Sequence, residues 1–489
     1  MIVLYNPWST HSERKPLPMS LLAVASKLEG EFDYEIVDGN LEADPVARIV
    51  QIARQRGAIA IGVTVMPGPQ LSHAVVDSRR LKRQLPGIPI IWGGYFPSQH
   101  ASVVLRDEAI DFCIGGQGEL STLQLMRALR SGGAVDGIAG LSRRDGGSIQ
   151  HTPIGPLTPL DELPLWPYQR VPLERYVHSH YLGERVTMHH SSYGCPHGCS
   201  FCAVVGIARR RWVAESPART EQVLRYHQQR CGADAVQFHD MDFFISEARV
   251  VEIADRMRDM DMRWWALGRV DELMRYSESS WQAMKRSGLK MVFCGAETGS
   301  AVAMRMMNKG GDVSGGRTLE LARRMRHYGV VPEFSFVLGS PPDPLEDVDA
   351  TLELVRRIKT VNPDAEVILY MYTPVPLESE LFATATRLGF RFPETLDEWV
   401  SGDWSSFALR RNPGDLWLHG RLRRRVRNFE RVLNAYYPTV TDSNLSGAKR
   451  AVLRGLGAWR YKLRFYAAPY ELRVFQRLFG YQRPETTGF

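Results

Sequence analysis

Alternation of strands and helices is the feature that most constrains the fold of this 489-residue chain. In the first 150 residues, apolar runs at 2–5, 34–37, 58–66, 88–92 and 112–114 alternate with segments of helical periodicity. The run at 58–66 is continuous, as expected of a strand that helices cover on both faces. This spacing predicts an α/β domain with a doubly wound parallel sheet over residues 1–150.

The same alternation resumes after a proline-rich stretch, which is interpreted as a linker over residues 151–184. Strands are expected at 185–191, 235–239, 263–268, 290–295, 332–338 and 366–372, with a helix after each. Six such units predict a partial (β/α)6 barrel over residues 185–395, with its site at the carboxyl ends of the strands. Residues 396–489 are expected to form a basic helical C-terminal domain.

Charge is spread unevenly along the chain. Residues 409–489 hold 17 basic and 5 acidic side chains, a net charge of +12, whereas the remaining residues carry −5. Two interpretations stay open: a helical cap that packs its apolar face on the barrel, or basic amphipathic helices that contact an anionic membrane surface. No recognition motif for nucleic acid accompanies the charge. No apolar window of 18 residues and no signal peptide are found, so we expect a cytoplasmic protein, with membrane association as the alternative.

Three of the six cysteines stand in one short stretch directly after the first strand of the second sheet, as Cys195, Cys199 and Cys202. Three thiolates with C-x3-C-x2-C spacing suit an iron-rich centre. Three ligands leave one iron of a four-iron cluster open. A closed zinc site would need a fourth ligand, which His197 could supply. Zinc and an inert cysteine group remain the alternatives to the cluster.

The cysteine motif resembles that of the radical S-adenosylmethionine (SAM) superfamily, with Phe201 at the usual aromatic position. The resemblance implies a [4Fe-4S] cluster on the three cysteines, whose open iron chelates SAM and releases a 5′-deoxyadenosyl radical. Further stretches resemble SAM-contacting motifs of the superfamily, although Met241 replaces a second acidic residue and Pro342 and Leu377 replace glycines. The implied SAM-binding residues are Phe201, Asp240, Arg269, Glu297, Gly339 and Pro376. Arg269 would face the SAM carboxylate and Glu297 the ribose hydroxyls.

A doubly wound domain, a linker and such a barrel, in that order, resemble the cobalamin (B12)-binding radical SAM enzymes. The implied cobalamin contacts lie at strand ends of the first sheet: Met66, Pro67, Gly68, Gly93, Gly94, Gly115, Gly116, Gly118 and Glu119. No Asp-x-His-x-x-Gly segment occurs in residues 1–130. The resemblance therefore implies base-off cobalamin without a histidine ligand, with the corrin between the two domains.

The leading interpretation is a C-methyltransferase that acts on an unactivated carbon through the 5′-deoxyadenosyl radical and methylcobalamin. A cyclisation or rearrangement without methylation, like that of porphyrin cyclases or lipid-modifying members, is the alternative within the family. A non-catalytic cobalamin or iron–sulfur sensor is the alternative of another class. Tyr193 and Tyr370 are candidate catalytic residues, and a small or lipid-like substrate and a flavodoxin or ferredoxin reductant are the expected partners.

Overall fold

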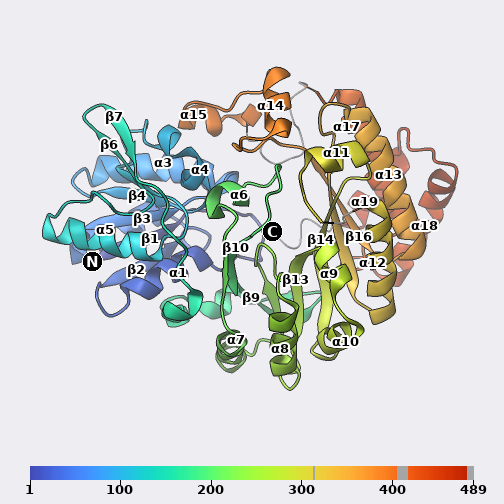
Figure 1. The fold of residues 1–489 in the computed structure, drawn as a ribbon, viewed down its shortest axis with the longest axis horizontal. Helices are drawn as coiled ribbons and strands as arrows, with labels where there is room; N and C mark the ends of the chain where they lie inside the picture. The colour runs from blue at the N-terminus through green and yellow to red at the C-terminus, as the bar shows by residue number, and fades with distance from the viewer. Residues whose placement is uncertain (312–313, 405–416, 482–489) are drawn as a thin grey trace.

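Two seven-stranded sheets organise the chain, and a group of helices follows the second sheet (Figure 1). The computed structural model describes residues 1–311, 314–404 and 417–481. Parts of the predicted C-terminal domain, residues 405–416 and 482–489, lie outside the described residues.

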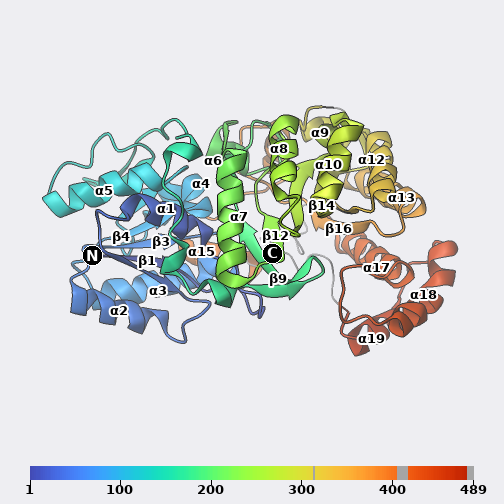
Figure 2. The same ribbon diagram turned by 90° about the horizontal axis from the view of Figure 1, so that it is seen from below.

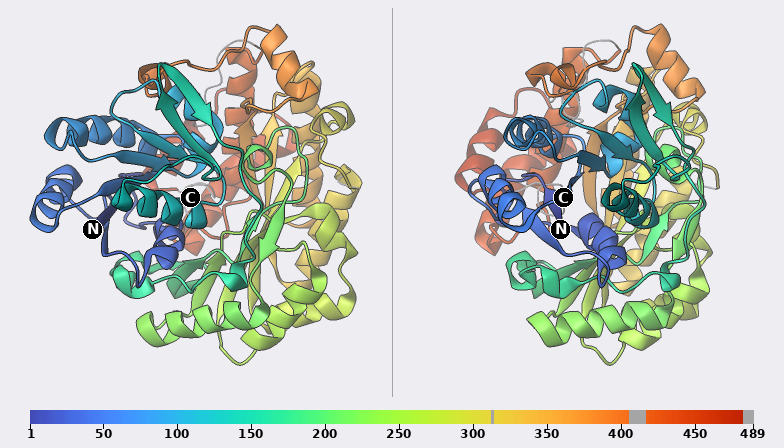
Figure 3. Two further views of the ribbon diagram at one scale, coloured as in Figure 1. Left: turned by 60° about the vertical axis from the view of Figure 1, so that its left-hand side comes forward. Right: turned by 90° about the vertical axis from the view of Figure 1, so that its left-hand side faces the viewer.

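The N-terminal sheet has the strand order β2-β1-β3-β4-β5-β6-β7, in which the first five strands are parallel. These strands are β1 (Ile2–Asn6), β2 (Tyr34–Asp38), β3 (Ala60–Thr64), β4 (Ile90–Gly93) and β5 (Phe112–Ile114). The antiparallel hairpin of β6 (Leu141–Asp145) and β7 (Ser148–His151) was not anticipated from the sequence. It extends the sheet beyond β5 (Figure 3).

Helices cover both faces of this sheet, as Figure 2 shows with α1 and α5 on one side and α2 and α3 on the other. They are α1 (Met19–Leu28), α2 (Pro45–Arg56), α3 (Pro69–Gln84), α4 (Tyr95–Val104) and α5 (Glu119–Ser131). Two separate hydrophobic clusters fill the layers between sheet and helices. A doubly wound domain results because strands buried on both faces need helices on both sides.

The second sheet has the order β16-β15-β14-β13-β12-β9-β8, in which only β8 is antiparallel. Its six parallel strands agree closely with the predicted ones, and the open sheet curves as a partial barrel. The strands are β8 (His178–His180), β9 (Gly183–His189), β12 (Ala235–Phe238), β13 (Arg263–Arg269), β14 (Leu289–Glu297), β15 (Val331–Leu338) and β16 (Glu366–Met371). The predicted fold class is confirmed.

Helices pack on one face of the barrel sheet and share a large hydrophobic core with it. The main helix after each strand of the parallel set begins with a cap from a serine or aspartate side chain. The main helices are α7 (Pro217–Cys231), α8 (Glu247–Met257), α10 (Glu278–Arg286), α12 (Gly315–Tyr328), α13 (Pro344–Val361) and α14 (Glu380–Arg387). The shorter elements are β10 (Ser192–Gly194), β11 (Trp212–Ala214), α6 (Val204–Ala208), α9 (Val270–Arg275) and α11 (Ala301–Met306).

The segment after the barrel returns to the N-terminal domain before the chain enters its last helices. Helix α15 (Leu396–Trp399) lies beside α3 and α4 in Figure 1, and Leu396 and Trp399 join the hydrophobic core there. Arg79 of α3 forms an ion pair with Asp397 at 2.7 Å. The linker approaches the same domain from the other side, where the Tyr176 hydroxyl donates to Asp38 at 2.8 Å.

Three helices complete the described chain at the end farthest from the N-terminal domain (Figure 2). They are α17 (Gly420–Tyr436), α18 (Gly447–Lys462) and α19 (Tyr470–Leu478). Their inward residues, including Phe429, Tyr461 and Leu472, belong to the core of the barrel. No helix among the described residues is both long enough and apolar enough to cross a bilayer.

Candidate active site

The cysteine loop begins at Gly194, where β10 ends at the carboxyl side of the barrel. Gly194 has φ +83°, and a Cβ there would lie 2.2 Å from the carbonyl oxygen of Arg211, so the turn into the loop requires glycine. Cys199 is buried, and Cys195 and Cys202 are half-buried. The three thiols lie close enough to influence one another's ionisation. One short loop therefore presents all three sulfurs together.

Burial disfavours the thiolates of this loop. It raises the pKa of Cys195 to about 12, and it also raises the pKa of Cys199, against the opposing effect of the Lys309 and Arg269 cations. Three buried or half-buried thiols held together need a cationic centre to ionise. The donor set therefore fits the iron–sulfur cluster predicted from the motif.

Residues 306–310 wrap the cysteine loop, although more than a hundred residues separate the two in sequence. The Ser200 amide donates to the carbonyl of Met307 at 2.9 Å, and its hydroxyl donates to the carbonyl of Met306 at 2.6 Å. Asn308 donates to the carbonyl of Gly198 at 3.4 Å. The Met-Asn-Lys-Gly stretch, recognised as a motif in the sequence, thus forms one wall of the site.

The Arg269 guanidinium lies against the cysteine loop at the end of β13. It forms a two-pronged ion pair with Asp271, at 3.0 and 3.2 Å, and donates to the carbonyl of Lys309 at 2.9 Å. Its Nη1 lies 3.5 Å from the Cys199 sulfur. Arg269 is therefore bound to protein groups on several sides, and contact with a SAM carboxylate remains a prediction.

Glu297 and Lys309 form a buried ion pair at 2.5 Å. Glu297 stands at a bulge of β14 and has φ +61°, which turns its carboxylate back over Gly295. A Cβ at Gly295 would lie 2.1 Å from that carboxylate. The backbone is strained here to hold one carboxylate in place, as a ligand-binding residue requires. Contact of Glu297 with the SAM ribose remains a prediction.

A second buried acid lies beside the cysteine loop and was not found from the sequence. Neither carboxyl oxygen of Asp242 receives a hydrogen bond from the described residues. Burial, and then the neighbouring Glu272 carboxylate, raise its pKa well above the usual range. His197 bridges this pair to the loop, with its Nε2 2.7 Å from Glu272 and 3.7 Å from Asp242. Asp242 is thus a buried acid without a hydrogen-bond partner among the described residues, next to the cysteine loop.

The zinc interpretation can be weighed on the same geometry. Ligand atoms of Cys195, His197 and Asp242 lie within 4.8 Å of one another. This group takes only one of the three cysteines, and the Nε2 of His197 is directed to Glu272. The arrangement favours the three-cysteine cluster, with His197 supporting the loop from within.

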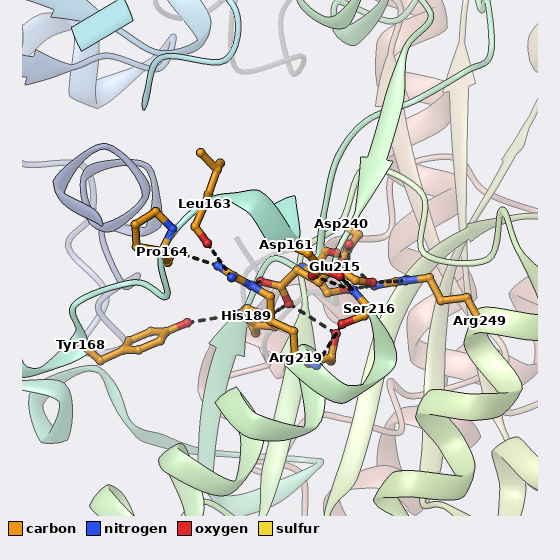
Figure 4. Close-up of polar contacts among 12 residues, drawn as sticks. Asp161, Leu163, Pro164, Tyr168, His189, Glu215, Ser216, Arg219, Asp240 and Arg249 are labelled. Carbon is orange, nitrogen blue, oxygen red and sulfur yellow. Dashed lines mark hydrogen bonds and ion pairs between the residues drawn. The ribbon is translucent and has the colours of Figure 1, made fainter. Parts of the chain in front are cut away.

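Asp240 positions the strand that leads into the cysteine loop. Both of its oxygens accept hydrogen bonds from Ser191, at 3.0 to 3.2 Å. Arg249 donates to the Ser191 carbonyl at 3.0 Å and to the backbone carbonyl of Glu215 at 2.9 Å. Figure 4 shows these contacts converging from β12, α8 and the segment before α7. The Asp240 oxygens are therefore engaged by protein, and the predicted contact with SAM is untested.

The same network ties the linker to the barrel (Figure 4). His189 lies 2.9 Å from the Glu215 carboxylate and 3.2 Å from the Tyr168 hydroxyl. Arg219 bonds Glu215 at 3.2 Å and the linker carbonyls of Leu163 and Pro164. The linker and the segment that leads into the cysteine loop therefore share one set of polar contacts.

The remaining predicted SAM residues lie at neighbouring strand ends. Phe201 is half-buried within the cysteine loop and packs on the barrel core. Gly339 follows β15 with φ +75°, where a Cβ would meet Leu418 at 2.6 Å. Pro376 follows β16, next to Leu377, which a Cβ at Gly206 of α6 would touch at 3.4 Å. The residues after β15 and β16 therefore reach the same edge as the cysteine loop.

The two candidate tyrosines occupy different places. Tyr193 lies on β10 beside the N-terminal domain, where burial and the Glu119 carboxylate both raise its pKa. Tyr370 is half-buried on β16, paired in register with Val337. Two acids lie nearer the starts of β15 and β16, Glu333 and Glu366. Glu333 accepts a hydrogen bond from the Trp265 indole at 2.9 Å, and burial, with a smaller effect of the Glu366 carboxylate, raises the pKa of Glu333 to about 8. A catalytic role for either tyrosine remains a prediction.

The ends of β3 and β4 in the N-terminal sheet are open backbone. Met66 is 50% exposed, and Pro67 and Gly68 are half-buried beside it. No atom lies within 4 Å of a Cβ at Gly68, and at Gly93 only one carbonyl does so, at 3.9 Å. Gly94 has φ +96° and packs its Cα side against Thr64 and Val65. The open backbone fits close approach by a large flat ligand, as predicted for cobalamin.

The end of β5 is covered by the linker instead. A Cβ at Gly116 would meet Ile154 at 2.7 Å, and Gly115 has the same neighbour at 3.7 Å. Gln117 exchanges hydrogen bonds with Thr158. Gly118 and Glu119 begin α5, and burial raises the pKa of Glu119. At Gly115 and Gly116 the linker thus packs against the strand end, and contact of these glycines with cobalamin remains a prediction.

Comparison with known proteins identifies the family. Residues 10–125 match the B12 binding domain, and residues 190–355 match the Radical SAM superfamily. The chain belongs to the cobalamin-binding radical SAM family. As a member of this family it is an enzyme, and the family implies a [4Fe-4S] cluster, SAM and cobalamin as its cofactors.

The relatives of this radical SAM enzyme are distant. It is 26% identical, over 70% of its own length and 73% of the relative's, to an uncharacterized methyltransferase of Pyrococcus horikoshii. It is 24% identical, over 72% and 70%, to the anaerobic magnesium-protoporphyrin IX monomethyl ester cyclase of Synechocystis. The structure of the radical SAM methyltransferase TsrM of Kitasatospora setae, with cobalamin and a [4Fe-4S] cluster bound, matches with a TM-score of 0.66 at 16% identity, over 98% of both chains. That match shows a shared fold.

Proposed function

We propose that this radical SAM enzyme is a cobalamin-dependent C-methyltransferase that acts on an unactivated carbon of a small or lipid-like substrate. The observation that carries the proposal is the placement of the cysteine loop at the junction of the two domains. Tyr193 lies two residues before Cys195, and burial and the Glu119 carboxylate of the N-terminal domain raise its pKa. Arg211, which follows α6, donates to the linker carbonyl of Gly155 at 2.6 Å. A substrate between the domains would therefore reach both cofactor sites.

When bound, SAM at the cluster supplies a hydrogen-abstracting radical, and cobalamin supplies a carrier for the methyl group. The chain contributes binding and orientation. The Cys199–Arg269–Asp271 contacts hold the cysteine loop, and Lys309 fixes the Glu297 carboxylate beside it. Burial of these charged groups keeps the site free of bulk water, which protects radical chemistry. An external one-electron donor, flavodoxin or ferredoxin, completes the proposal.

Cyclisation without methylation is the second candidate function. The observation in its favour is the relative from Synechocystis, whose name is that of a cyclase. The methyltransferase names of the other relatives favour methylation.

The two functions differ in the products of SAM. The protein would be reconstituted anaerobically with iron, sulfide and cobalamin, reduced, and incubated with methyl-deuterated SAM and metabolite extract. We expect a product that carries the deuterated methyl group, with S-adenosylhomocysteine and 5′-deoxyadenosine formed in parallel. Deoxyadenosine with a new product that lacks the label would indicate cyclisation and refute the methyltransferase proposal.

A matched pair of cysteine variants controls the experiment. Cys199→Ala removes a thiol of the loop and should abolish formation of 5′-deoxyadenosine and of the methylated product. Cys231→Ala removes a buried thiol on α7, outside the site, and should leave the product pattern unchanged.

A further inference from the structure

Large apolar side chains stand exposed on the last two described helices and the loop that joins them. Leu463 and Leu478 are more than 70% exposed, and Tyr470 is 70% exposed. Together with three neighbours they form what we call the C-terminal patch: Trp459, Leu463, Phe465, Tyr470, Val474 and Leu478. Apolar groups of this size normally lie inside a protein or against a partner.

The patch follows helical periodicity on the outward faces of α18 and α19. Tyr470, Val474 and Leu478 recur every four residues along α19 and so form one stripe. Leu472, on the opposite face of α19, is fully buried in the core. The helix therefore has one apolar face packed on the protein and a second that no described residue covers. The helical-cap interpretation of the tail explains the first face and leaves the second unexplained.

Arg460 fixes the corner between the two helices. Its guanidinium lies over the Trp459 ring at 4.7 Å and the Phe465 ring at 5.3 Å. It also bonds Glu471 in the first turn of α19 and the carbonyl of Ala467 at 2.7 Å. The exposed rings are thus held in place by a buried arginine, so the patch is a preformed surface.

Positive charge surrounds the patch. Residues 447–481 contain eight basic side chains and one acidic side chain, Glu471, which is bound to Arg460. Lys462, Arg473 and Arg477 are exposed, and no described acidic residue pairs with them. A second copy of this face would bring like charges together, whereas an anionic surface would neutralise them.

We propose that the C-terminal patch docks on the surface of an anionic lipid bilayer. Tryptophan and tyrosine favour the headgroup level of a membrane because their rings are amphipathic. Basic side chains beside an apolar stripe are the pattern by which helices lie in the interface. The patch is at the end of the molecule farthest from the N-terminal domain (Figures 1 and 2), so docking leaves the domain junction accessible.

Vesicle flotation with the full chain tests the proposal. The probes are phosphatidylcholine vesicles with and without phosphatidylglycerol. We expect binding to the phosphatidylglycerol vesicles that weakens as salt is raised, and much weaker binding to phosphatidylcholine alone. Replacement of Lys462, Arg473 or Arg477 by glutamine, one at a time, should lower the partition coefficient into phosphatidylglycerol vesicles about fivefold.

Glutamate substitutions at two exposed leucines test the apolar part of the patch. Leu463→Glu with Leu478→Glu should reduce binding at least about tenfold, since both side chains would enter the interface. Both are highly exposed in the folded chain, so circular dichroism should stay unchanged. Leu345→Glu is the matched control, because Leu345 is 53% exposed on α13 away from the patch. It should bind as the parent does.

The proposal is wrong if anionic vesicles do not bind, or if the two glutamate substitutions bind as tightly as Leu345→Glu. Light scattering after gel filtration gives a separate check. A dimer that Leu463→Glu and Leu478→Glu dissociate would assign the patch to a second copy of the chain and overturn the lipid assignment. Methyltransferase assays play no part in these outcomes, so failure of the proposed function would leave the test intact.

Discussion

Helices begin differently in the two domains that meet at the candidate active site. In the barrel, a side chain caps the main helix after each parallel strand: Ser216, Ser246, Ser277, Ser314, Asp343 and Ser379. The short helices α6 and α9 have no such cap. In the N-terminal domain, the helices after β3, β4 and β5 begin at Gly68, Gly94 and Gly118, which have no capping side chain. Both sets lie at carboxyl edges of parallel strands, where ligands bind.

The difference indicates how each edge meets its ligand. A cap engages one amide at the helix start, which favours recognition of ligands in the barrel through side chains such as the cysteines, Arg269 and Glu297. Bare glycines leave backbone amides and surface free for a large ligand that approaches closely. A side-chain site tolerates few substitutions of its charged groups, whereas a backbone site is sensitive to any added Cβ. The following predictions test this contrast.

The largest effect is expected at the cysteine loop. Cys199→Ala should abolish the cluster, because the two remaining thiols are too few to hold a [4Fe-4S] cluster. Iron and sulfide analysis with Mössbauer spectroscopy after anaerobic reconstitution would measure this. Cys231→Ala should keep full iron content, and retention of the cluster in Cys199→Ala would disprove the ligand assignment.

Lys309→Met should destabilise the barrel by about 3–5 kcal/mol, because it leaves the buried Glu297 carboxylate without its cation. Chemical denaturation monitored by tryptophan fluorescence would measure the loss. The double variant Lys309→Met/Glu297→Gln should recover most of that stability and still bind SAM poorly. Equal stability of the single and double variants would show that the ion pair is unimportant.

Stability should also depend on pH through Glu333. Burial raises its pKa to about 8 from 4.5, so the folded state keeps a proton that the unfolded state loses above pH 4.5. The free energy of unfolding should therefore fall as pH rises from about 5 to 8, by about 1.4 kcal/mol per pH unit from this group. Glu333→Gln should flatten the profile measured by denaturation, and an unchanged slope would contradict the assignment.

In the N-terminal domain, Gly94→Ala should lower the free energy of unfolding by about 1–3 kcal/mol, since φ +96° disfavours any residue with a Cβ. Cobalamin content after reconstitution should fall with it, because the β4 turn would shift. Gly455→Ala in α18 is the control: no atom lies within 4 Å of its Cβ, and it should stabilise slightly. Normal cobalamin content in Gly94→Ala would show that this glycine-lined strand end is not part of the cobalamin site.

The smallest effects distinguish the two kinds of helix start directly. Asp343→Ala removes the cap of α13, in which the carboxylate accepts from Glu346 at 3.1 Å, and should cost about 1 kcal/mol. Gly118→Ser introduces a side chain at contacts of 3.7 Å or more and should change stability by only a few tenths of a kcal/mol. Thermal melts can compare the pair. A large loss in Gly118→Ser would mean that the bare start of α5 is needed for folding.

The sequence predicted the parallel strands well because buried strands are apolar on both faces. It did not predict the β6–β7 hairpin, whose residues include Arg143, Arg144 and Asp145 and are mostly exposed. The signal was the Gly146-Gly147 pair, which has positive φ at both positions and is typical of a hairpin turn. Polar two-stranded extensions leave little other trace in composition.

At the site, motifs identified residues but could not identify their partners. The cysteines, Arg269 and Glu297 were found from local spacing, whereas the contact of Lys309 with Glu297 depends on a bulge in β14. Asp242 and Glu272 meet only because β12 and β13 are neighbours. Gly116 was predicted from its position after β5, whereas the packing of Ile154 beside it could not be predicted from spacing. Such pairings are set by the tertiary fold.

The return of the chain to the N-terminal domain has a consequence for how the enzyme could open. That domain is attached at its exit by the linker, through Tyr176 and Asp38, and again by α15, through Trp399 stacked on Phe392 and edge-on to Phe96. A domain attached at one point could rotate away about that hinge. A domain attached at two points can only slide or twist over a short range, unless both attachments break together. We therefore expect substrate and product to exchange with only small relative motion of the two domains, and amide protection of the two attachments should be lost at the same denaturant concentration.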